Sequence, residues 1–206
     1  ISNLVSGSGL VKFNNIGVIS INDSELYWTS IIREYNELSV NGGSSGGFNT
    51  RNGFVASFYD HRISAGAYFG IFDNVDITTI NKCRIGIQDN RLAHSLTWYG
   101  LKFMNCDSST ISIQNNEIVS IFNQSLGDST GYGIQIKDCY GDITIDDNHF
   151  GIDSSETVVG SIFDDIIRIE NSRGVNHFEI NNNVFASSFE NAINFKNVTG
   201  TPTILG

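Results

Sequence analysis

Asp60, His61 and Arg62 are the neighbouring residues in this sequence that are best suited to chemistry. The chain has only 12 Lys and Arg residues and 4 His residues, so a cation beside an imidazole and a carboxylate is uncommon in it. A lyase that acts on a uronic-acid polymer needs a base such as His, and an Arg that neutralises the substrate carboxylate. Arg91 and His94 offer the same combination further along the chain. A solvated loop with local ion pairs is the structural alternative for both groups.

Paired carboxylates would instead indicate a glycosidase, in which one acts as the acid and the other as the base or nucleophile. Asp60 and Asp89 would lie in neighbouring repeats and form the first pair to consider. Two weaker pairs arise freely in an Asp-rich chain: Asp128 with Asp153, and Asp164 with Asp165. The catalytic candidates are therefore Asp60, His61, Arg62, Asp89, Arg91 and His94.

Aromatic residues near the loops could bind the faces of sugar rings. Sugars stack on flat apolar surfaces and are held by planar polar groups that bind their hydroxyls. Trp98 is the strongest of these candidates, because Trp98-Tyr99-Gly100 precedes a strand and flanks a loop. Partial burial in the core is the alternative for each of them. The substrate-binding candidates are Tyr59, Trp98, Tyr99, Tyr132 and Trp28.

The elements that would position these residues repeat along the chain. One segment, 133–150, reads GIQIKDCYGDITIDDNHF and alternates apolar and polar residues, which is typical of half-buried strands. Each repeat begins with an aromatic residue or Ile, then any residue, then Asn or Asp; the lead residues are Phe13, Phe72, Phe103, Ile136, Ile169 and Phe195. These lead residues are 59, 31, 33, 33 and 26 residues apart. A second motif, Ile-x-x followed by Asn, Ser or Cys, begins at Ile21, Ile80, Ile113, Ile145 and Ile180.

Two linked motifs that recur together indicate a stacked architecture. The apolar period of two excludes helical repeats, and a Leu-rich consensus is absent. We therefore predict an all-β fold, a right-handed single-stranded parallel β-helix of about six to seven coils with long loops on one side. Residues at equivalent positions in successive repeats, which we call residues of equal phase, would lie ~4.8 Å apart and form columns. One column would contain Asn15, Asn74, Asn105, Asp138, Asn171 and Asn197. A second column would contain Ser24, Cys83, Asn116, Asn148 and Asn183, and it is the poorer of the two because only three of its members are Asn.

The loops between the second motif and the next repeat have similar lengths. The intervals from Ile85 to Phe103 and from Ile118 to Ile136 are both 18 residues. Loops of equal phase would stack into a wall beside the strands and form a long groove. Such a groove suits an extended polymer.

Composition limits the classes of partner. The chain is expected to form one domain over 1–206, as a fragment of a longer protein, with an irregular Gly-rich insertion at about 42–68. The net charge of −10 argues against nucleic acid or an anionic membrane as a partner. No run approaches the ~20 apolar residues of a membrane span. Neither a metal site nor a cofactor is indicated by any motif, and Cys106 and Cys139 are predicted to be buried thiols.

The two repeated motifs, for example Phe103-x-Asn105 and Ile113-x-x-Asn116-x-Ile118, resemble those of the pectate-lyase-like right-handed parallel β-helix superfamily. The similarity is greatest to phage tailspikes and related polysaccharide depolymerases, and it covers roughly residues 9–206. It implies homotrimers that bind glycan in a groove, outside the cell or on a virion surface. The resemblance lies in the scaffold, and no catalytic motif of the family is matched, so no catalytic role is carried over.

Three functions remain open from the sequence. The first is recognition and cleavage of an extended polysaccharide, by a lyase or a glycoside hydrolase. The second is a glycan-binding adhesin without catalysis. The third is a structural spike or stalk segment whose loops form subunit contacts.

Overall fold

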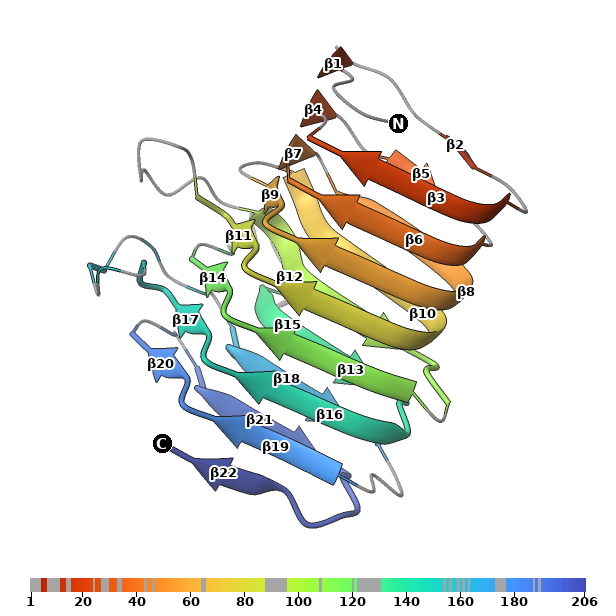
Figure 1. Ribbon diagram of the computed structural model, residues 1–206. Helices are drawn as coiled ribbons and strands as arrows, with labels where there is room; N and C mark the ends of the chain where they lie inside the picture. The colour runs from red at the N-terminus through yellow and green to blue at the C-terminus, as the bar shows by residue number, and fades with distance from the viewer. Residues whose placement is uncertain are drawn as a thin grey trace.

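The structure is a computed structural model, which describes most of the chain (Figure 1). The described residues are 5–6, 12–13, 16–23, 25–26, 30–32, 35–42, 44–45, 47–63, 66–87, 96–107, 109–119, 121, 131–153, 155, 157–158, 160, 162, 164–172, 177–186, 188 and 190–206. Every regular element in this part of the chain is a β-strand. Within it there is no helix with the length and apolar character that a membrane span requires.

A curled sheet contains two ladders of parallel strands, which we call ladders A and B. Ladder A comprises β2 (Lys12–Phe13), β5 (Ser30–Ile32), the first parts of β8 (Phe48–Tyr59) and β10 (Gly66–Asn81), β12 (Leu96–Met104), β15 (Tyr132–Lys137), β18 (Ile167–Glu170) and β21 (Ile193–Lys196). Ladder B comprises β3 (Ile16–Asn22), β6 (Tyr35–Asn41), the second parts of β8 and β10, β13 (Ser109–Gln114), β16 (Gly141–Asp146), β19 (His177–Asn181) and β22 (Thr203–Leu205). The long strands β8 and β10 therefore join the two ladders.

A second sheet of short strands forms ladder C. It comprises β1 (Val5–Ser6), β4 (Glu25–Leu26), β7 (Ser44–Ser45), β9 (Arg62–Ile63), β11 (Arg84–Ile85), β14 (Glu117–Ile118), β17 (His149–Phe150) and β20 (Val184–Phe185). The chain passes from ladder A to ladder B to ladder C and then back to ladder A, each time one strand further down the stack. Figure 1 shows this as a column of strands that runs from the N-terminal to the C-terminal end.

Apolar residues of equal phase fill the space between the ladders. Phe72 is in register with Phe103, Phe103 with Ile136, and Ile136 with Ile169, as the repeat predicts. All four side chains are 0% exposed, and the rings of Phe72 and Phe103 are stacked 4.9 Å apart. Burial of one such side chain stabilises the fold by about 1.5–3 kcal/mol. Burial of these stacked rows is therefore the main contribution to the stability of the fold.

The long interval between Phe13 and Phe72 contains two further strands of each ladder. Phe13 is in register with Ile32, and Thr50 is in register with Phe72. The repeats here span 19, 18 and 22 residues, so they have no long loop. The described residues of 42–68 lie mainly in β7, β8, β9 and β10, which pair on both sides. The prediction of an irregular insertion at 42–68 is wrong for these residues, because they form shorter repeats in the same register.

A bend separates ladder A from ladder B, and Asn or Asp occupies it. Positive φ values of 52–57° occur at each described member of this column: Asn52, Asn74, Asn105, Asp138, Asn171 and Asn197. Asn and Asp adopt this left-handed conformation more readily than other residues with a side chain. Asn74 Nδ2 donates to Asn52 Oδ1 at 2.8 Å, and Asn197 Nδ2 donates to Asn171 Oδ1 at 3.2 Å. The predicted column is confirmed for the described residues; Asn15 lies outside them.

A second column lies inside the fold, where ladder B passes into ladder C. Asn116 Nδ2 donates to Asn148 Oδ1 at 2.9 Å, and Asn148 Nδ2 donates to Asn183 Oδ1 at 3.0 Å. The same oxygens accept backbone N–H groups, including Cys83 N on Asn116 Oδ1 at 2.8 Å. This column was predicted to be the poorer one. It is the better bonded of the two, because the core shields its carboxamides from water.

The cysteines are free and buried at all three positions, Cys83, Cys106 and Cys139. Cys106 and Cys139 share a phase with the buried Val75 and therefore pack as small apolar groups, as the sequence predicts.

Candidate functional site

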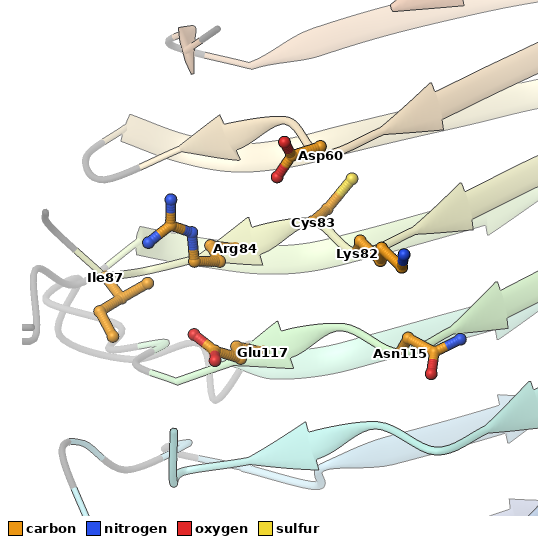
Figure 2. A pocket seen from close by; sticks show the side chains of 7 residues that line it. All are labelled: Asp60, Lys82, Cys83, Arg84, Ile87, Asn115 and Glu117. Atoms are coloured by element: carbon orange, nitrogen blue, oxygen red, sulfur yellow. The ribbon is translucent and has the colours of Figure 1, made fainter. Parts of the chain in front are cut away.

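A polar pocket opens at the corner where ladder B passes into ladder C. It has a volume of about 300 Å³ and is lined by Asp60, Lys82, Cys83, Arg84, Ile87, Asn115 and Glu117. Figure 2 shows that these side chains come from consecutive strands of the stack, with Asp60 and Glu117 on opposite sides of the level that carries Lys82 and Arg84. Carboxylates and cations thus line one small space, which suits a ligand with hydroxyl or carboxylate groups.

The bend at this corner explains which side chains reach the pocket. Asp60, Lys82 and Asn115 have φ values of 50°, 55° and 57°. A left-handed residue turns the chain sharply, so each of these side chains lies outside while the following residue points into the core. His61, Cys83 and Asn116, which follow them, are each at most 1% exposed. The exposed bend residues therefore form the outer wall of the second column.

Lys82 is held at the edge of the pocket by Tyr59. Its Nζ donates to the Tyr59 hydroxyl at 3.1 Å and lies 5.4 Å from the centre of the Tyr59 ring. This hydrogen bond raises the pKa of Lys82, so the side chain is a cation near neutral pH. Lys82 can therefore bind an anionic or hydroxyl group but is poorly suited to act as a base.

Charged side chains of both signs lie along the outer face of ladder C. Arg84 is in register with Arg62 on one side and with Glu117 on the other. Side chains at such positions are direct neighbours, so Arg84 and Glu117 can interact across the ladder. Cys83 lies at the base of the pocket, and burial raises the pKa of its thiol to about 12. The thiol is therefore neutral and is not suited to act as a nucleophile.

The three adjacent catalytic candidates, Asp60, His61 and Arg62, do not lie on the same side of the sheet. Asp60 is exposed on the pocket wall, and Arg62 is half-buried in ladder C. His61 is only 1% exposed, and its ring packs 5.5 Å from that of Phe48. Its Nδ1 donates to the carbonyl of Gly42 at 2.7 Å, and burial lowers the pKa of His61 to about 4. His61 is a core residue, so its position does not fit a base that acts on an external ligand.

Tyr99 and Tyr132 are brought together, but their rings are occupied by neighbours. The two rings are stacked 6.1 Å apart in adjacent strands of ladder A. Lys102 Nζ lies 4.4 Å from the centre of the Tyr99 ring, and the Arg168 guanidinium lies 5.1 Å from that of Tyr132. Tyr132 is 6% exposed. These rings form a cation–aromatic stack rather than open platforms for sugars.

Asp164 and Asp165 lie beyond this stack, close to Glu190. Carboxylate oxygens of the three residues lie within 4.8 Å of one another, and no other such group of three metal-ligating side chains occurs in the described part of the chain. The Asp165 oxygens already accept from Arg168, Asn191 and Asn194 at 3.2, 2.7 and 2.9 Å. A carboxylate bonded in this way has little capacity left for an ion, so we infer no metal site here.

Several candidates lie outside the described residues: Asp89, Arg91, His94 and Trp28. Trp98 lies in β12, but only its backbone is described. Most of the predicted loop wall, including 88–95 and 122–130, is likewise outside them. Sequence reasoning missed Lys82, Arg84 and Glu117 as pocket residues. The sequence feature that could have identified them is their position in the repeat: they directly precede or follow Cys83 and Asn116, which are members of the second column.

No protein-family model, curated protein or solved structure matches this chain.

Proposed function

We propose that this protein recognises an extended polysaccharide and that the corner pocket is a subsite for one of its sugar units. The observation that carries the proposal is the lining of the pocket, which places Asp60 and Glu117 around Lys82 and Arg84. Carboxylates accept hydrogen bonds from sugar hydroxyls, and cations bind hydroxyls or acidic groups. Tyr59, 44% exposed beside Lys82, adds an aromatic surface at the rim.

The scaffold proposed for this function is a right-handed parallel β-helix of phage-tailspike type. The cyclic order of the three parallel ladders supports this interpretation. A rigid stack presents equivalent side chains at a spacing of ~4.8 Å, so adjacent subsites can line up along a chain-like ligand. Within this proposal the protein acts as a homotrimer outside the cell or on a virion surface.

We further propose that, if the polysaccharide is cleaved here, hydrolysis fits the pocket better than elimination. A lyase needs a base beside the substrate, but Lys82 is held as a cation and His61 is enclosed by the core. Asp60 and Glu117 lie two strand levels apart, on opposite sides of the level that carries Lys82 and Arg84 (Figure 2), so the two carboxyl groups can approach one sugar unit from two sides. Hydrolysis uses two carboxyl groups that flank the glycosidic bond, one as the acid that protonates the leaving oxygen and the other as the base or nucleophile.

The test is incubation of the protein with panels of neutral and acidic polysaccharides. Retention of a polysaccharide on immobilised protein is expected, and shortening of the chains without new absorbance from a double bond would support hydrolysis. If the chains become shorter and the double-bond absorbance appears, cleavage occurs by elimination, and the proposal of hydrolysis is wrong. Retention without shortening would support the alternative, a glycan-binding adhesin. Failure to retain any polysaccharide would overturn the proposal and favour the structural stalk.

A further inference from the structure

The register of ladder A brings two carboxyl groups together near the C-terminal end of the stack. Ile167 in β18 pairs with Ile193 in β21, so Asp164 and Glu190, each three residues earlier, occupy equivalent positions in adjacent levels. Their carboxylate oxygens lie within 4.8 Å of one another. Asp164 is only 2% exposed, so water screens its charge weakly. Two negative charges in this arrangement repel each other.

The groups around Asp164 do not neutralise a second charge. Asp165 presents another carboxylate, which is already bound to Arg168 at 3.2 Å. The side chain of Tyr132 faces Asp164, but burial raises the pKa of its hydroxyl, so it stays neutral. Asp164 Oδ1 accepts the backbone N–H of Asp165 at 3.1 Å, which satisfies one of its oxygens. The described charged and titratable groups that face Asp164 are therefore Tyr132, Asp165, Arg168 and Glu190, and Arg168 is committed to Asp165.

We propose that Asp164 and Glu190 share one proton and form a pH-sensitive lock between β18 and β21. When the proton is present, one carboxyl group donates a hydrogen bond to the carboxylate of the other. When the proton leaves for solvent, the two anions repel each other and the pairing of β21 on β18 weakens. Among the described strands β21 is paired only with β18, so it can separate while the rest of ladder A stays in place.

The direction of the pH dependence follows from the chemistry of Asp164. Its burial, followed by the hydrogen bond and charge of Glu190, raises the pKa of Asp164 from 3.8 to about 6. The stabilising contribution of the shared proton is therefore complete at a pH below the ordinary pKa, and it is lost as the pH rises through about 6. The lock is closed in mildly acidic solution and open in neutral solution.

Backbone amide hydrogen exchange of β21 measures the lock directly. After correction for the intrinsic exchange rate, we expect the protection of Ile193–Lys196 to fall about tenfold or more between pH ~5 and pH ~7.5, since one pKa unit corresponds to a factor of ten. Glu190→Gln can still donate a hydrogen bond to Asp164 but has no charge, so its protection should change little over this range. Glu179→Gln is the matched control. Glu179 pairs with His177 at 3.1 Å at the same end of the stack but lies in ladder B.

Two outcomes would overturn the lock. One is that Glu190→Gln keeps the full pH dependence of the unaltered protein. The other is that the carboxyl carbon of Asp164, followed by NMR, titrates near its ordinary pKa of 3.8. Both readouts are independent of any polysaccharide, so they are separate from the proposed function.

Discussion

Asn116 and Asn148 are joined by a hydrogen bond of 2.9 Å inside the core, although they lie 32 residues apart in the sequence. Asn148 also donates to the carbonyl of Ile113 and accepts the backbone N–H of Asn116. Every polar atom of its side chain is thus bonded, and it is 0% exposed. Because the Asn148 carboxamide ties three strand levels together, the column fixes the vertical register of the stack as well as stabilising the corner.

Asn148→Ala should therefore be one of the most destabilising single changes. It removes the acceptor of the Asn116 backbone N–H and of one Asn116 side-chain N–H, and the donor to the carbonyl of Ile113, all in the core. Each buried unsatisfied group costs about 1–3 kcal/mol, so we expect a loss of about 3 kcal/mol in the free energy of unfolding. Urea denaturation measures it. Thr110→Ala, on the exposed face of ladder B, is the control and should change stability by less than about 0.5 kcal/mol. A similar small effect for Asn148→Ala would show that the column is not bonded as described.

The all-β fold of stacked parallel strands was predictable because the two motifs recur at matching positions along the chain. Phe103 and Ile136 could be placed in one row from their spacing alone, and the register confirms it. The sequence could not show which of the two Asn columns is better hydrogen-bonded. The position of a bend residue in the repeat does not reveal whether its side chain faces the core or the solvent. The short repeats after Phe13 were missed because neither matches the whole motif. Thr50 occupies one lead position and lacks the aromatic or Ile side chain, and Ile32 occupies the other but is followed two residues later by Glu34 in place of Asn or Asp.

Asn105→Val should reveal the cost of the left-handed bend. Asn105 has a φ of 53° and is exposed, so loss of packing contributes little at this position. A β-branched residue is strained at positive φ, and we expect a loss of about 1–2 kcal/mol. Asn105→Gly is the matched control, because Gly adopts this conformation without strain, and it should stay within about 0.5 kcal/mol of the unaltered protein. Equal losses for Val and Gly would assign the effect to the side-chain amide instead of the backbone.

His61 should make the fold sensitive to acid. Its pKa falls from 6.5 to about 4 on folding, because the buried imidazole is protonated only at a cost in desolvation. A depressed folded pKa gives stability that is present above pH ~6.5 and is lost as the pH falls toward about 4. The loss is on the order of 3 kcal/mol. Thermal unfolding of His61→Asn and of the unaltered protein at several pH values measures the difference.

The expected result is a flatter stability profile for His61→Asn over this range. Asn is the residue that occupies the same phase at position 116, and it carries no charge at any of these pH values. His177→Gln is the control, because His177 is 56% exposed in its side chain and should have little effect. An unchanged profile for His61→Asn would contradict the burial of a neutral imidazole.

The candidate site was less predictable than the fold. Of the triplet Asp60, His61 and Arg62, only Asp60 lines the pocket, because alternation carries His61 inward while Asp60 stays outside. Lys82, Arg84 and Glu117 come from other repeats, and only the vertical stacking brings them to Asp60. A search for catalytic residues that are adjacent in sequence therefore finds one wall of the pocket and misses the other two.

Lys82→Ala is the most direct test of the corner pocket. It removes a cation from the pocket and the hydrogen bond to the Tyr59 hydroxyl, both on the surface, so the fold should persist. A hydrogen bond from a charged group contributes about 1.5–3 kcal/mol, so retention of a bound polysaccharide should weaken about tenfold or more. Lys137→Ala is the matched control, because it removes a cation from ladder A and should leave retention unchanged. Equal weakening by both variants would indicate a general charge effect, and would remove the pocket as the subsite.

Glu117→Gln and Asp60→Asn separate binding from cleavage at the same pocket. Each keeps a side chain of nearly the same shape that can still form hydrogen bonds, but neither can exchange a proton as a carboxyl group does. If the two carboxylates hydrolyse the glycosidic bond, either variant should retain polysaccharide within a few-fold of the unaltered protein while its rate of chain shortening falls by about a hundredfold or more. The chain length of the product and the retained amount are measured on the same samples. Unchanged shortening in both variants would place the chemistry elsewhere on the molecule.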